Sequence, residues 1–166
     1  MVAAFFVSGR CLNTDAGIII LIMKQGNIKE KKLPRGVRNC NPGNIRKSGD
    51  VYQGEIESTD KDFKQFRNMA YGYRAMFKIL RTYKNNYSLN TLEQMIYRWA
   101  PPKENKTDVY VDFVANRSGI GRKDIVDVSN MTVMCRIVEA MATMECGGNT
   151  GWVPDMNEVR DGWILL

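Results

Sequence analysis

The sequence predicts a mainly helical domain, α+β in class, with one small β hairpin. Four segments after residue 70 carry apolar residues at three- and four-residue steps, which is the spacing of a helix with one buried face. Before them, 45–66 contains short runs of apolar and aromatic residues divided by turn residues, a pattern typical of short β structure. The chain has 166 residues, of which 44% are hydrophobic and 25% charged, so one globular domain can form its own core.

The hairpin and the first helix come first in the chain. A turn at 47–50 divides Asn44–Arg46 from Val51–Gln53, and we expect these two segments to pair as strands. The first helix is predicted over Tyr71–Tyr87. Its apolar face consists of Tyr73, Met76, Phe77, Leu80 and Tyr83.

Three further helices follow. The second begins near Thr91, because Thr91 and Gln94 can form a capping box. The third begins at Thr107 and is followed by Gly119, and the fourth spans about 131–144. The residues of the third helix expected to face inward are Val109, Tyr110, Phe113 and Val114.

The chain divides into an uncertain leader, 1–32, and a single domain, 33–166. The leader is apolar and then basic, but its apolar runs are too short to span a bilayer, and it lacks a clear signal peptide. Met23 is a candidate alternative start. The net charge of +6 is concentrated between residues 24 and 47. Such a block suits an anionic partner, although no nucleic-acid-binding motif accompanies it, so we do not expect nucleic acid as the partner.

The chain contains no histidine, which excludes Ser-His-Asp and Cys-His hydrolases and zinc sites that need imidazole. The four cysteines have no CxxC spacing, and we expect free thiols rather than a redox motif or a metal site. We therefore expect no metal and no cofactor. Acid–base chemistry would depend on Glu, Asp, Lys or Tyr, and glycoside cleavage meets that restriction because carboxyl groups can carry it.

The densest motif is Asn41-Pro42-Gly43-Asn44, which predicts a type II turn with glycine at its third position. Asn39, Asn41 and Asn44 offer uncharged amide donors and acceptors, which suit a sugar ligand. The alternative is a surface turn whose asparagines bond only to their own backbone.

Glu145 is the candidate general acid. It ends the fourth helix, where unpaired carbonyl groups disfavour a carboxylate anion, and burial would add to that effect. Both effects produce the protonated carboxyl that donates to a glycosidic oxygen. The alternative is an exposed glutamate in a fraying last turn.

Candidates for a second carboxylate are Glu55, Glu57 and Asp60, which cluster after Tyr52 and Gln53. Four acids in this polar loop, counting Asp62, are also compatible with simple solvation. Trp99, with Asn105 nearby, offers an aromatic plane and an amide for a sugar ring; the alternative is a core tryptophan before a helix stop.

Three blocks of the sequence resemble a lysozyme-like domain of phage and prophage proteins, many of which are described as virion structural proteins. The first is Arg35–Ile45, reading RGVRNCNPGNI, with Tyr52-Gln53-Gly54 after it; the second is Arg98–Tyr110, which contains WAPP and EN; the third is the helix that ends at Glu145. The chain departs from the family pattern at Cys40, Tyr52 and Met144, where asparagine, tryptophan and histidine are usual.

The resemblance implies a lysozyme-like fold in a circularly rearranged order, with the hairpin first and the Glu-ended helix last. It implies cleavage of the peptidoglycan glycan strand, as a muramidase or a lytic transglycosylase, with Glu145 as general acid. Asn39, Asn41, Asn44, Tyr52, Gln53, Trp99, Asn105 and Tyr110 would bind substrate.

The alternative is a non-catalytic virion structural or glycan-binding protein. In either case the expected partners are peptidoglycan or a related glycan and other virion proteins. The expected location is the cytoplasm during synthesis and then the phage virion or the host cell wall.

Overall fold

The computed structural model describes residues 19–20, 31–103 and 105–166. Most of the predicted leader therefore lies outside the described residues, as does the Met23 start. Of that segment, the structure describes only β1 (Ile19–Ile20) and β2 (Lys31–Lys32), which pair antiparallel. The described residues include no helix with the length and apolar character needed to cross a bilayer.

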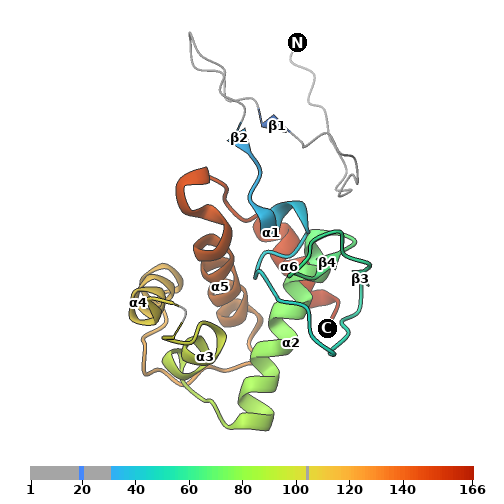
Figure 1. Cartoon of the computed structure of the whole chain (residues 1–166). Coiled ribbons are helices and arrows are strands. Elements are labelled where there is room, and N and C mark those ends of the chain that lie inside the picture. Colours follow the sequence, from blue (N-terminus) through green and yellow to red (C-terminus); the bar gives the residue numbers. More distant parts are fainter. Residues whose placement is uncertain (1–18, 21–30, 104) are drawn as a thin grey trace, which may run out of the picture.

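The fold is mainly helical with a small antiparallel sheet, as the sequence predicts (Figure 1). The helices are α1 (Arg35–Arg38), α2 (Met69–Tyr87), α3 (Leu92–Trp99), α4 (Thr107–Ser118), α5 (Met131–Ala142) and α6 (Met156–Ile164). A π-helical segment, η1 (Thr143–Gly147), and a 3-10 turn, η2 (Gly148–Thr150), continue α5. The small sheet pairs β3 (Glu55–Ile56) with β4 (Gln65–Phe66).

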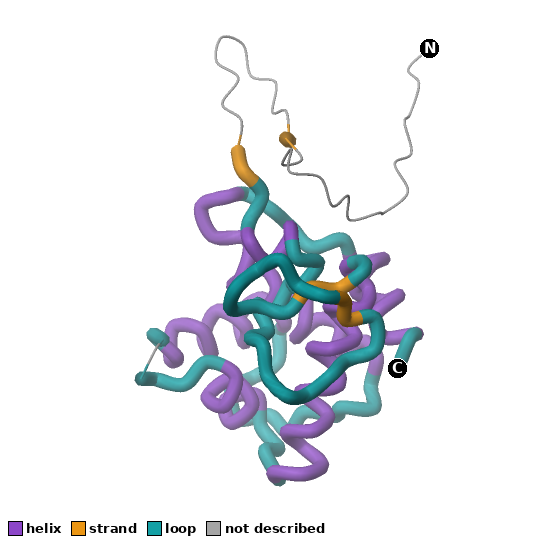
Figure 2. Tube along the Cα trace, turned by 45° about the vertical axis from the view of Figure 1, so that its right-hand side comes forward, coloured by secondary structure: helices purple, strands orange, loops and turns teal. Residues whose placement is uncertain are grey.

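The core surrounds α5, whose buried residues include Met134, Ile137, Val138 and Met141. In Figure 1, α4 lies to the left of α5, α3 lies below it, and α2 and the loops around β3 and β4 lie to its right. Helix α4 packs on α5, while α6 packs on both α2 and α5. Figure 2 shows the loops of the β3–β4 region gathered on one side of the helices.

Local capping signals mark the helix starts, although α2 begins at Met69, two residues before the predicted Tyr71. The side chain of Asn68 caps the start of α2, and Thr91 and Gln94 form the predicted capping box at α3. Helix α4 begins at Thr107 and stops at Gly119, whose φ of 69° is the left-handed value that glycine adopts at low cost.

The predicted strand partners are wrong. Asn44–Arg46 does not pair with Val51–Gln53; instead β3 pairs with β4, and Arg46 forms an isolated bridge with Phe63. Residues 47–53 form a loop instead of a strand. The backbone carbonyls of Ser48 and Asp50 in this loop accept hydrogen bonds from the buried Lys64 ammonium, and not from a neighbouring strand.

Two finer predictions also need correction. Val109 of α4 is 57% exposed, and Val111 is the buried residue instead. The turn at Asn41–Asn44 forms, with the Asn44 N–H donating to the Asn41 carbonyl, but Gly43 does not have the positive φ of a type II turn. Gly43 is required for packing, because a Cβ there would lie 2.8 Å from Cζ2 of Trp99.

The cysteines differ from one another. Cys135 and Cys146 are buried free thiols, as expected. Cys40 is disulfide-bonded, so the expectation of free thiols is wrong for this residue.

Candidate functional site

Glu145 lies in η1, directly after the core helix α5, and its side chain is half-buried. Its Oε1 accepts hydrogen bonds from Trp99 Nε1 at 3.1 Å and from the Tyr110 hydroxyl at 3.0 Å. Its Oε2 accepts one from Asn44 Nδ2 at 3.0 Å. Three neutral donors therefore surround this carboxylate, and no Lys or Arg of the described residues forms an ion pair with it.

The contact between Asn44 and Glu145 joins residues 101 positions apart. Asn44 also donates to the backbone carbonyl of Glu145 at 3.3 Å. The backbone of Asn44 is in the left-handed region, with φ of 46°, which asparagine tolerates better than most residues. The acid at the end of the last long core helix thus faces the asparagine-rich turn near the front of the chain.

Gly36 allows this approach. A Cβ at Gly36 would lie 2.5 Å from Sγ of Cys146, 2.7 Å from the Asn41 carbonyl oxygen and 2.9 Å from Oδ1 of Asn44. Only a residue without a side chain fits between the turn and η1. The thiol of Cys146 in turn donates to the Pro42 carbonyl at 3.5 Å.

Two groups beside Glu145 stay protonated. Burial, followed by the charge of Glu145, raises the pKa of the Tyr110 hydroxyl well above its ordinary value. Burial, again followed by Glu145, raises the pKa of the Cys146 thiol to about 12. Tyr110 is therefore a hydrogen-bond donor to Glu145 at neutral pH, and Cys146 is an unreactive thiol.

The structure gives structural roles to several residues predicted to bind substrate. Asn41 is fully buried; its Nδ2 donates to the carbonyls of Ile45 and Lys64, and its Oδ1 accepts from the Ile45 N–H. Asn39 is 7% exposed and donates to Asp60. Asn41 therefore holds the turn together, and Asn39 joins it to the loop that contains Asp60, so both side chains have structural partners.

Tyr110 and Trp99 both contact Glu145. Tyr110 is 5% exposed and supports Glu145 from inside the fold. Trp99 packs its ring against Gly43 and turns its indole N–H toward Glu145. Asn105 is exposed and donates to the Pro101 carbonyl.

The three candidates for a second carboxylate do not reach Glu145 through any hydrogen bond. Glu55 neutralises the buried Lys64, with 2.9 Å between Oε1 and Nζ, and its Oε2 accepts from the Tyr52 N–H. Asp60 accepts from Asn39 and from two backbone N–H groups, whereas Glu57 is exposed. Glu55 and Asp60 each have a structural partner, so neither carboxylate is free to act as a catalytic base.

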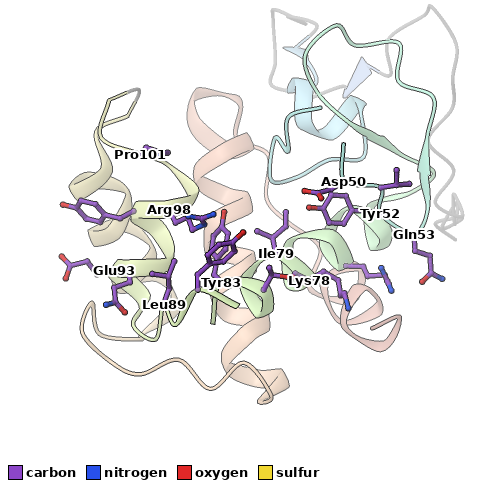
Figure 3. Close-up of a pocket in the computed structure, with 16 residues that line it drawn as sticks. Asp50, Tyr52, Gln53, Lys78, Ile79, Tyr83, Leu89, Glu93, Arg98 and Pro101 are labelled. Atoms are coloured by element: carbon purple, nitrogen blue, oxygen red, sulfur yellow. The ribbon is translucent and has the colours of Figure 1, made fainter. Parts of the chain in front are cut away.

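A groove of about 1370 Å³ is lined by residues of α2, α3 and the 50–53 loop (Figure 3). Figure 3 shows Glu93, Arg98 and Pro101 on one wall, Asp50, Tyr52 and Gln53 on the opposite wall, and Lys78, Ile79 and Tyr83 of α2 between them. The remaining lining residues are Val51, Arg74, Thr82, Tyr87, Leu89, Gln94 and Tyr97.

Of the residues predicted from sequence, only Tyr52 and Gln53 line the groove, and Glu145 does not. The α2 and α3 residues of the groove were missed. Tyr83 and Tyr87 are four residues apart on one helix, and Arg98 precedes the predicted Trp99, so an aromatic pair at helical spacing was the available signal. The contact of this tyrosine pair with Arg98 depends on tertiary packing, which the sequence pattern does not show.

Comparison with known proteins adds a relative. No protein-family model matches the chain. Protein P5 of Pseudoalteromonas phage PM2 is 41% identical to it over 119 residues, which is 69% of this chain and 72% of the phage protein. The chain belongs to the family of phage PM2 protein P5. This match supports the expectation of a phage-related protein.

The described residues of this P5-family protein contain no group of three or more Cys, Asp and Glu side chains that could hold a metal ion. The Glu145 cluster can hold a carboxylate in a fixed position, and the groove offers tyrosine faces and charged edges to a long ligand.

Proposed function

We propose that this P5-family protein binds peptidoglycan glycan strands in the groove between α3 and the 50–53 loop. The observation that carries the proposal is the lining of the groove. Tyr52, Tyr83, Tyr87 and Tyr97 contribute rings with an apolar face and a polar edge, which can stack on sugar rings and bond to their hydroxyls. A volume of about 1370 Å³ fits several sugar units rather than a single small molecule.

The state of Glu145 favours binding without turnover. Its carboxylate already accepts three hydrogen bonds, and it does not line the groove where the glycan would lie. A general acid must reach the glycosidic oxygen within hydrogen-bond distance. No second carboxylate of the described residues is hydrogen-bonded to this cluster. These features and the phage relative are consistent with a virion protein that binds the cell wall, or that has a structural role beside other virion proteins.

Cleavage of the glycan strand is the second candidate, and one observation favours it. Helix α5 and η1 bring Glu145 to the front turn, next to Asn44, Trp99 and Tyr110. A lysozyme-like fold in circularly rearranged order requires this contact between the acid and the asparagine-rich turn. In that case Glu145 would protonate the leaving oxygen after a local movement that frees one of its oxygen atoms.

Two assays on purified, insoluble peptidoglycan separate the candidates. We expect the wild-type protein to co-sediment with the wall without clearing it in a zymogram. Tyr87→Ala should weaken co-sedimentation, whereas Tyr87→Phe, which keeps the ring, should bind like the wild type. Clearing that disappears in Glu145→Gln would establish the second candidate instead, and absence of both binding and clearing would overturn both.

A further inference from the structure

Arg98 occupies an unusual position in the groove. It is an exposed residue of α3, and its guanidinium carbon lies 3.9 Å from the centre of the Tyr87 ring and 5.4 Å from that of Tyr83. Both tyrosines belong to α2 and line the same groove. Figure 3 shows the side chains of Arg98 and Tyr83 next to each other. Two cation–π contacts therefore hold one guanidinium in place.

No acid neutralises this guanidinium among the described residues. Glu93, the acid of the same helix in the groove, forms its ion pair with Arg122. Asp50, the other acid of the lining, lies on the opposite wall (Figure 3). Arg98 is thus a positioned cation without a carboxylate partner.

Contact with the tyrosine rings uses the face of the guanidinium and leaves N–H groups at its edge for other acceptors. Those groups form a rigid fork that matches a planar carboxylate with two parallel hydrogen bonds. The charge of the surroundings supports such a ligand, because the lining contains Arg74, Lys78 and Arg98 against Asp50 and Glu93, and Glu93 is already paired.

We infer that Arg98, held between Tyr83 and Tyr87, is the carboxylate-recognition point of the groove, so that the ligand is an acidic glycan rather than a neutral one. This inference rests on the proposed glycan-binding function and specifies its substrate class. In peptidoglycan, the free carboxylate belongs to the attached peptide or, where no peptide is attached, to the lactyl group of N-acetylmuramic acid. Chitin, which has the same sugar backbone without a carboxylate, should bind less tightly.

The first test uses a matched pair of sugars and the full chain. N-acetylmuramic acid and N-acetylglucosamine differ by the lactyl group alone, so each is titrated while the Nε–H signals of arginine side chains are followed by NMR. We expect the Arg98 signal to shift saturably with the acid and to stay unchanged with the neutral sugar. Arg98→Ala assigns that signal, and Arg160→Ala, which removes an exposed arginine of α6 outside the groove, should leave the response intact.

The second test measures binding to the insoluble wall before and after its carboxyl groups are converted to amides. Amidation should weaken wild-type binding about tenfold, the loss expected for a charge-assisted, two-bond contact. Arg98→Ala should show the same loss on the untreated wall and little more on the amidated one. Arg98→Lys should recover the charge but only part of the affinity, since lysine lacks the planar fork.

The outcomes separate this inference from the proposed function. Equal binding of the wild type and Arg98→Ala to the wall, with no Arg98 shift, overturns the carboxylate site and leaves glycan binding in place. An Arg98 shift with the acid but no binding to the wall supports the site and overturns the wall as its ligand. Failure of both tests overturns both.

Discussion

Replacing Glu145 with alanine tests whether this carboxylate stabilises the fold. The substitution removes the acceptor of three donors: the Trp99 indole N–H, the Tyr110 hydroxyl and the Asn44 amide. Tyr110 is 5% exposed, so its hydroxyl would lose its partner inside the fold without replacement by bulk water. At about 1–1.5 kcal/mol for each of the three bonds, Glu145→Ala should lower the free energy of unfolding by about 3–4.5 kcal/mol.

Glu145→Gln provides the comparison, because the amide retains an oxygen for Trp99 and Tyr110. Its amino group would face the Asn44 amino group, but Oδ1 of Asn44 is buried without a hydrogen-bond partner. Rotation of the Asn44 amide would present that oxygen to the new donor. We therefore expect a loss of only about 1 kcal/mol for Glu145→Gln.

Urea denaturation followed by far-UV circular dichroism measures both variants against the wild type. Tyr110→Phe, made alone and together with Glu145→Ala, shows the share of the loss that comes from the hydroxyl. If Glu145→Ala were as stable as the wild type, or if both substitutions cost the same, the carboxylate would not organise these donors and the reasoning would be refuted.

Three further predictions concern packing and pH. Gly36→Ala should lower stability by about 2–3 kcal/mol, since its Cβ would overlap Sγ of Cys146; an unchanged melting temperature would contradict this contact. Stability should also fall as pH rises from 9 toward 12, because burial raises the pKa of the Cys146 thiol from 9.0 to about 12 and the unfolded chain releases that proton first. Cys146→Ala should reduce this slope in urea midpoints measured from pH 8 to 11, and an identical slope would exclude the thiol as its source. Asp60 should affect stability at acid pH. Burial alone would raise the pKa of its carboxyl, but hydrogen bonds from Asn39 and from backbone N–H groups, together with the charge of Arg35, have the larger effect and hold the pKa below its ordinary 3.8. The ionised Asp60 should therefore contribute to the free energy of unfolding above pH 3.8, and this contribution should be lost as the pH falls below that value. Asp60→Asn should remove this part of the acid unfolding transition. An acid transition that is the same in Asp60→Asn and the wild type would contradict the prediction.

The sequence predicts the long helices because their signals are local. Apolar periodicity and caps lie within one segment, as at Thr91 and Gln94. Helix α1 was missed because four residues are too few to show a period. Helix α6 was overlooked although Asp155 caps it and Met156, Val159 and Trp163 recur at three- and four-residue steps. The hairpin register was wrong because the buried Lys64, a tertiary feature, organises the loop.

The candidate site was only partly predictable, because residue type does not reveal the partner of a polar side chain. Asn39, Asn41 and Asn44 look alike in sequence, yet each has a different partner. Asn39 donates to Asp60, Asn41 bonds to the backbone of the turn, and Asn44 reaches Glu145. An asparagine in a tight turn has backbone groups within easy reach, and this local competition favours structural use. Only the fold distinguishes Asn44, through the approach of η1 that Gly36 permits.

Helix α3 connects the two candidate regions of the molecule. Successive helical residues point about 100° apart, so Arg98 can face the groove while Trp99 donates to Glu145. A ligand at Arg98 would then lie one residue from the indole that holds the carboxylate. Glycan binding therefore does not require Glu145 to be free. Cleavage requires either a movement of Asn44 that releases Oε2, or movements of both Trp99 and Tyr110 that release Oε1. The carboxylate's hydrogen bonds, rather than its place in the chain, decide between a binding protein and an enzyme.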